Sequence, residues 1–106
     1  MDSARLVEKR MLGIALKDFL WAKDSHGAWS PHWCPAGEGM VDFAAFFEII
    51  KAARFAGPVQ LHFEYADMGG AENGNRTLTV SKEQAIAHMQ RDLSYVRGQM
   101  KIAGLA

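Results

Sequence analysis

Apolar residues recur along this chain with two different spacings, which predict strands alternating with helices. The run Met11–Phe19 is apolar until it reaches Lys17 and Asp18, which is typical of a strand buried on both faces of a parallel sheet. The segment Val59–Tyr65 alternates between apolar and polar residues, as a strand with one buried face does. The sequence therefore predicts two strands of different character.

Helical spacing follows each predicted strand. Asp42 is a suitable N-cap for a helix that stops at Gly57 and Pro58. The apolar face of this helix contains Phe43, Phe46, Phe47, Ile50 and Ala53. Ser81 and Gln84 match a capping box at the start of a second helix. The apolar residues of the second helix step by threes and fours, and they are Ile86, Met89, Leu93, Val96, Met100 and Ala103.

The order of these elements is strand, long loop and helix, repeated once, with a short helical stretch over Ala4–Arg10 before them. This order favours parallel strands joined by right-handed crossovers. Two parallel strands leave both outer edges of their sheet unpaired, so we expect neighbouring strands from outside the chain. The polar face of the second strand, with Gln60, His62 and Glu64, suits the lumen of a barrel near its catalytic end. We therefore predict an α/β fold in which residues 1–106 are the C-terminal fragment of a partial (β/α)8 TIM barrel, its last two βα units.

Composition and charge narrow the functional classes. The chain has 106 residues, which allows one domain at most. Lys plus Arg and Asp plus Glu number 12 each, so no net charge draws the chain to nucleic acid or to anionic lipid. Cys34 is the single cysteine, which excludes an internal disulfide and fits a reducing compartment. With no apolar run of membrane-spanning or signal-peptide length, the sequence predicts a cytoplasmic protein with no nucleic-acid or membrane partner.

Glu64 is the best candidate for chemistry, because it lies near the carboxyl end of a predicted strand, where barrel side chains converge on a substrate. His62 lies two residues earlier on the same face and could hold Glu64 or donate to a substrate hydroxyl. Lys17 and Asp18 end the neighbouring strand. A solvated Glu64 and a purely structural His62 are equally compatible with the sequence.

The long loop Ala22–Met40 and Trp21 before it contain further candidates. Its aromatic rings and Trp21 could stack on the C–H face of a sugar, or could plug the top of a barrel. Glu38 stands in a Gly-Glu-Gly turn of this loop. The loop also holds His26, His32 and Cys34, but their spacing does not match a structural zinc site. In a second loop, Ala66–Thr79, glycine-rich backbone could bind an anion.

Three motifs resemble the last two strands of the xylose-isomerase-like sugar phosphate isomerases and epimerases, and the likeness spans nearly the whole chain. The motifs are Lys17-Asp18-Phe19, then Pro35-Ala36-Gly37-Glu38-Gly39-Met40-Val41-Asp42-Phe43, then Leu61-His62-Phe63-Glu64-Tyr65. The resemblance implies a TIM barrel with a divalent metal ion, manganese, magnesium, cobalt or zinc, held by two glutamates, an aspartate and a histidine. Glu64 matches a residue that is both a metal ligand and a candidate acid/base. Ala15 stands where many members of the family have a histidine ligand, and alanine binds no metal ion.

The resemblance thus implies part of a metal-dependent sugar isomerase or epimerase that transfers a proton next to a sugar carbonyl. Glu64 would be catalytic and would ligate the metal, and the substrate-binding residues would be His62, Lys17, Asp18, Trp21 and Glu38. The active site in this chain would be incomplete, so we expect no turnover by the chain alone. The alternative is a non-catalytic module that binds a carbohydrate, sugar phosphate or other small ligand. Endonuclease-like barrels are disfavoured by the zero net charge. Missing strands or self-association would have to complete the sheet.

Overall fold

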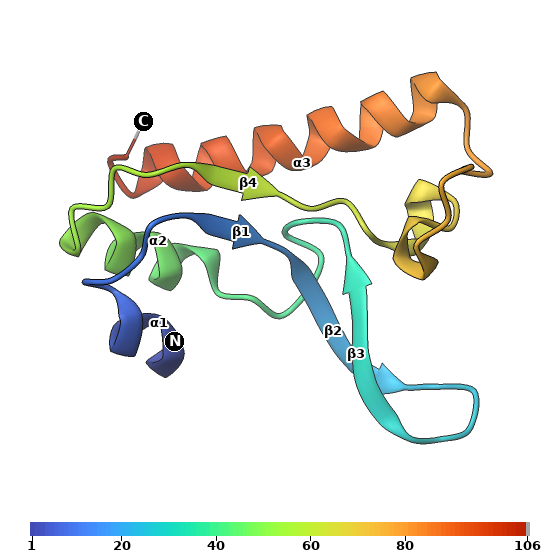
Figure 1. Cartoon of the computed structure of the whole chain (residues 1–106), viewed down its shortest axis with the longest axis horizontal. Coiled ribbons are helices and arrows are strands. Elements are labelled where there is room, and N and C mark those ends of the chain that lie inside the picture. The colour runs from blue at the N-terminus through green and yellow to red at the C-terminus, as the bar shows by residue number, and fades with distance from the viewer. Residues whose placement is uncertain (106) are drawn as a thin grey trace.

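A computed structural model shows a small mixed α/β fold, and it describes residues 1–105 (Figure 1). The helices are α1 (Asp2–Val7), α2 (Phe43–Ala52) and α3 (Lys82–Ile102). The strands are β1 (Ile14–Leu16), β2 (Asp18–Lys23), β3 (Trp29–Cys34) and β4 (Val59–Leu61). Two single-turn 3₁₀ helices, η1 (Ala66–Met68) and η2 (Ala71–Asn73), lie between β4 and α3.

The four strands form two separate sheets. β1 and β4 pair in parallel, with Ile14 opposite Val59 and Leu16 opposite Leu61, so the predicted parallel pairing is confirmed. β2 and β3 form an antiparallel hairpin that projects away from the parallel pair (Figure 1). The predicted first strand is therefore divided at Lys17, and its second part belongs to the hairpin.

The predicted partial TIM barrel is wrong for this chain. A barrel requires a sheet in which every strand has a neighbour on both sides. Here each sheet has two strands, and within residues 1–105 neither β1 nor β4 has a second neighbour. The alternation of strands and helices correctly indicated parallel pairing, but it does not determine whether a sheet continues or closes.

Local capping signals start the two long helices where the sequence predicts them, although α2 ends at Ala52, before the predicted stop at Gly57. The Asp42 side chain accepts a hydrogen bond from the Ala45 N–H at 2.9 Å, which satisfies a free donor in the first turn of α2. The capping box of α3 is complete, because Ser81 Oγ accepts from Gln84 N at 3.1 Å and Gln84 Oε1 accepts from Ser81 N at 2.9 Å. Gly104 follows α3 with a φ of +79°, the left-handed conformation that ends many helices.

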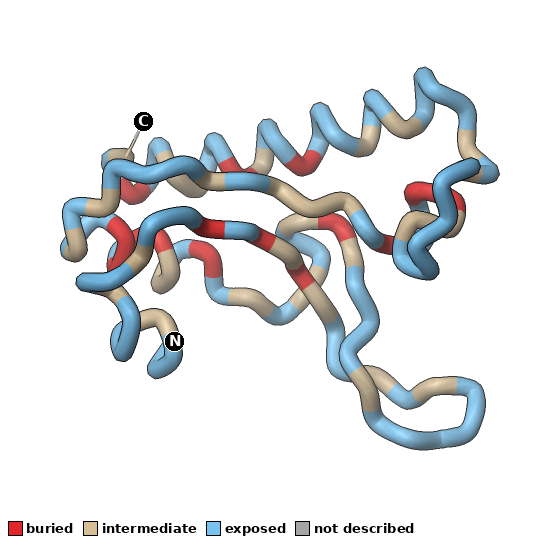
Figure 2. Tube along the Cα trace, viewed as in Figure 1, coloured by how far each residue is buried: buried red, intermediate tan, exposed pale blue. Residues whose placement is uncertain are grey.

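The core lies between the parallel pair and the helices α2 and α3. Its buried members are Ile14, Leu16, Phe43, Phe47, Ile50, Val96 and Ala103. In Figure 2 the buried residues gather on β1, on α2 and on scattered turns of α3, while the hairpin is largely exposed. None of the helices in residues 1–105 has the length and apolar character needed to cross a membrane.

Candidate functional site

Lys17, His62 and Glu64 form a polar cluster at the carboxyl ends of the parallel strands. Lys17 follows β1, and His62 and Glu64 follow β4, which ends at Leu61 and not at Tyr65 as the sequence predicts. Because the strands are parallel and in register, their carboxyl ends lie at the same end of the sheet. Lys17 Nζ makes an ion pair with Glu64 Oε2, and His62 Nδ1 lies 3.4 Å from the same oxygen. The cluster brings together three residues that the sequence singled out.

The cluster keeps Glu64 ionised. The hydrogen bond from Lys17 is the main reason that the pKa of Glu64 lies below its ordinary value, and His62 contributes in the same direction. The Glu64 side chain is nevertheless 46 % exposed, so its carboxylate can be reached from solvent. The ionised Glu64 carboxylate can accept hydrogen bonds from a hydroxylated ligand, while the Lys17 ammonium can donate to it and the His62 imidazole can do either.

Five rings on one side of the hairpin form what we call the aromatic face. The register places Phe19 opposite Trp33, Trp21 opposite Pro31 and Lys23 opposite Trp29, and directly opposed residues share a face. The aromatic face thus consists of Phe19, Trp21, Trp29, Pro31 and Trp33. The three tryptophans are 41–60 % exposed, so their rings are available for stacking.

Lys17 connects the aromatic face to the polar cluster. Its Nζ lies 4.7 Å from the centroid of the Trp33 ring while it pairs with Glu64. Phe19 packs edge-on against Trp33 with 6.1 Å between ring centroids, which orients the Trp33 ring. The two features therefore form one continuous surface that ends at Glu64.

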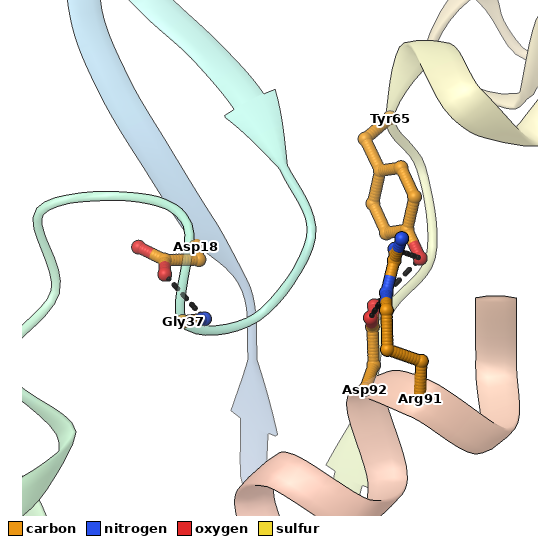
Figure 3. A network of polar contacts seen from close by, with 5 residues as sticks. All are labelled: Asp18, Gly37, Tyr65, Arg91 and Asp92. Atoms are coloured by element: carbon orange, nitrogen blue, oxygen red, sulfur yellow. Dashed lines mark hydrogen bonds and ion pairs between the residues drawn. The ribbon is translucent and has the colours of Figure 1, made fainter.

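Asp18 is buried, and its side chain forms hydrogen bonds with the loop after β3. Its side chain is 2 % exposed, and Figure 3 shows it pointing to the backbone of Gly37. Asp18 Oδ2 accepts from Gly37 N at 2.9 Å and from Gly39 N at 3.0 Å. Its Oδ1 accepts from Phe19 N at 2.9 Å and from Val41 N at 3.1 Å. The structure thus places this predicted substrate-binding residue in a buried position, where four amides surround it.

The remaining candidates lie outside the cluster. Glu38 is exposed, in the loop whose amides bond to Asp18. Burial of the thiol raises the pKa of Cys34 to about 11, and the charge of Glu38 contributes in the same direction. The glycine-rich loop before α3 offers a poor anion site, because the N–H groups of Asn73, Gly74 and Asn75 already donate to carbonyls within the loop. His26 and His32 are exposed on the hairpin.

The residues of this chain do not fit a metal centre of the kind the resemblance implies. Over residues 1–105 no group of three or more His, Cys, Asp or Glu side chains is arranged to hold a metal ion. Within the described part of the chain, His62 is the side chain of this type that contacts Glu64, and the Lys17 ammonium pairs with the same carboxylate. A metal ion at Glu64 would need ligands from another polypeptide.

A second polar group, Tyr65–Asp92–Arg91, was missed at the sequence level. Tyr65 Oη donates to Asp92 Oδ2 at 2.6 Å, and Arg91 Nε donates to Asp92 Oδ1 at 3.0 Å (Figure 3). Asp92 is 2 % exposed, and burial raises the pKa of Tyr65 well above its ordinary value. The signal was available, because Asp92 is a charged residue on the apolar face of α3, three residues after Met89. These contacts connect α3 to the segment between β4 and η1.

Comparisons with protein-family models, curated proteins and solved structures found no match to this chain. The likeness to the sugar isomerases therefore rests on the three motifs alone, and the function must be argued from the site.

Proposed function

We propose that this chain binds a carbohydrate, with the aromatic face stacking on the sugar and the polar cluster bonding to its hydroxyls. The observation that carries the proposal is the continuity of the two features through Lys17, which contacts both Trp33 and Glu64. Sugars present apolar C–H faces and polar hydroxyl edges, and this surface offers a partner for each.

The dimensions and exposure of the surface support this function. The strand from Phe19 to Lys23 extends for roughly 14 Å at about 3.4 Å per residue, which is longer than a single sugar ring. The hairpin exposes three half-buried indole rings on its two strands, and exposing this apolar area to water costs free energy unless a ligand or partner covers it. At its end, Lys17 supplies donors, Glu64 supplies acceptors, and His62 supplies either.

A second candidate function is a contribution to proton transfer in a sugar isomerase or epimerase, as the motif resemblance implies. The supporting observation is that Glu64 is accessible and has a lowered pKa, so it is ionised and able to accept a proton. Residues 1–105 place His62 and Lys17 beside Glu64 but contain no group of side chains arranged to hold a metal ion. We therefore expect the chain to show no turnover unless another polypeptide provides the metal ligands.

Calorimetric titration with neutral sugars and sugar phosphates tests the binding proposal. Trp33→Ala and Glu64→Gln should each weaken binding at least tenfold, because one removes a stacking ring and the other removes the charge at constant shape. Glu48→Gln is the matched control, since Glu48 is an exposed glutamate on α2, away from the cluster. The control should bind as the wild type does.

A chelator separates the two candidate functions. Sugar binding that EDTA leaves unchanged supports the carbohydrate-binding function. Binding that appears only with added Mn²⁺ or Mg²⁺ would support the isomerase candidate. If no sugar in the panel perturbs the tryptophan fluorescence or produces heat at millimolar concentration, the carbohydrate proposal is refuted.

The pH dependence of binding has a definite sign. Because the folded pKa of Glu64 is lowered, its charge is fully present above the ordinary value of 4.5 and is lost as the pH falls through the lowered pKa. Sugar affinity should therefore hold from neutral pH down past 4.5 and fall only below it. Lys17→Met should move this midpoint upward, as NMR titration of the Glu64 side-chain carboxyl would show. An unchanged midpoint would contradict the role of Lys17.

A further inference from the structure

The two ends of the aromatic face have the same arrangement of an indole ring and an ammonium group. At the end next to Glu64, Lys17 Nζ lies 4.7 Å from the centroid of the Trp33 ring. At the end next to the turn of the hairpin, Lys23 Nζ lies 5.7 Å from the centroid of the Trp29 ring. Lys23 is exposed and makes no ion pair within residues 1–105, so its ammonium can move to donate to a ligand hydroxyl. Each end therefore offers both a stacking ring and a donor.

The distance between these ends is too great for one monosaccharide. Trp29 and Trp33 are separated by four residue steps on β3, which is about 14 Å at about 3.4 Å per residue. A single sugar ring is shorter than this distance, so it cannot contact both indole rings. Trp21 lies between them on the neighbouring strand β2, opposite Pro31. The aromatic face therefore presents three tryptophans in a row, of which the two outer ones have an ammonium beside them.

The three indole rings are separate from one another. Within residues 1–105 the contact between rings on the hairpin is the edge-on pair of Phe19 and Trp33. Trp21 is 52 % exposed and Trp29 is 60 % exposed, both more than Trp33, so exposure does not fall with distance from Glu64. A two-stranded ribbon twists strongly, so the rings along it turn relative to one another. A ligand made of units joined by rotatable bonds can follow such a row, whereas a flat and rigid ligand cannot.

We infer that the ligand of this surface is an oligosaccharide of at least three sugar units, bound along the hairpin from Trp29 to Glu64. The inference rests on the carbohydrate-binding function proposed above and specifies its substrate class. One unit stacks on Trp33 and bonds to the polar cluster, a middle unit stacks on Trp21, and the far unit stacks on Trp29 and bonds to Lys23. Binding of one unit holds the linked units at a high effective concentration, which separate monosaccharides lack. Affinity therefore depends on the length of the chain of sugars.

A chain-length series tests the inference by calorimetric titration. The probes are glucose, cellobiose, cellotriose and cellotetraose, with the corresponding series built from xylose and from N-acetylglucosamine. In a series that binds, affinity should rise at least about tenfold from the monosaccharide to the trisaccharide, with one trisaccharide bound per chain. Trp29→Ala should abolish this gain with length. Leu20→Ala is the matched control and should keep the gain, because Leu20 is 46 % exposed on the opposite face of the hairpin.

Two further measurements do not depend on the folding of Trp29→Ala. Lys23→Met leaves every ring in place and should also reduce the gain with length, with circular dichroism to verify folding. In NMR spectra of the wild type, the trisaccharide should shift the indole N–H signals of Trp21, Trp29 and Trp33 together. If a monosaccharide binds and longer sugars bind no more tightly, or if the trisaccharide leaves the Trp29 signal unchanged, the inference is overturned while the carbohydrate-binding function stands. If no member of any series binds, both are overturned.

Discussion

Replacing Asp18 by Asn tests whether this residue is a structural anchor. The substitution keeps the shape of the side chain but removes its charge and turns one oxygen into an amide nitrogen. In the wild type, four backbone N–H groups donate to the Asp18 carboxylate, two to each oxygen, at 2.9–3.1 Å. Asparagine can accept from two of them at most, and its own N–H groups then face the other two.

The expected cost follows from the number of bonds lost. A hydrogen bond to a charged group contributes about 1.5–3 kcal/mol net, so the loss of two predicts a destabilisation of about 3–6 kcal/mol. This is a large part of the 5–15 kcal/mol that typically separates folded from unfolded states. Urea unfolding followed by tryptophan fluorescence should show a midpoint lower by at least about 1 M. Hydrogen exchange should accelerate at the amides of Gly37, Gly39 and Val41.

Asp24 provides the matched control. It also accepts from two amides, His26 N at 2.8 Å and Ala28 N at 3.0 Å, but in the solvent-exposed turn of the hairpin. Water can replace these bonds, so Asp24→Asn should cost about 1 kcal/mol or less. If Asp18→Asn costs no more than Asp24→Asn, the reasoning about the buried carboxylate is refuted.

Three further predictions follow from other parts of the fold. Gly39→Ala should destabilise the chain by about 2 kcal/mol or more, because its Cβ would overlap the Asp18 carboxylate and lie 2.6 Å from a backbone oxygen. Gly98→Ala, at an uncrowded position within α3, should stabilise the chain by about 0.5–1 kcal/mol. Urea unfolding measures both changes in the free energy of unfolding. Tyr65→Phe should cost about 1–3 kcal/mol by the same measurement, because it removes the donor 2.6 Å from a buried carboxylate oxygen, and a neutral result would contradict this. Burial raises the pKa of Cys34 to about 11 from the ordinary thiol value of 9.0, so less of the reactive thiolate is present at pH 8. Cys34 should therefore react with iodoacetamide about a hundredfold more slowly in the folded chain than in the urea-unfolded chain. Equal rates would contradict its burial.

The elements that the sequence predicted well are those with local signals. Asp42 and Ser81 were recognised as helix caps because a cap depends on residues within one turn of it. The polar cluster could be anticipated in part, since alternation put His62 and Glu64 on one face. That Lys17 would contact both Glu64 and an aromatic ring required the actual path of the chain, which no local signal gives.

The hairpin was missed because its pattern lacks a buried side. The segment Ala22–Met40 was interpreted as a loop, and Pro31 within it argues against a strand. Because the hairpin is mostly exposed, burial gave no alternation to recognise. The turn signal was present in retrospect: Asp24 bonds to two amides of the turn, and Gly27 takes a φ of +79°. Asp18 was misjudged for a related reason, since three of its four amide partners lie 19 to 23 residues further along the chain.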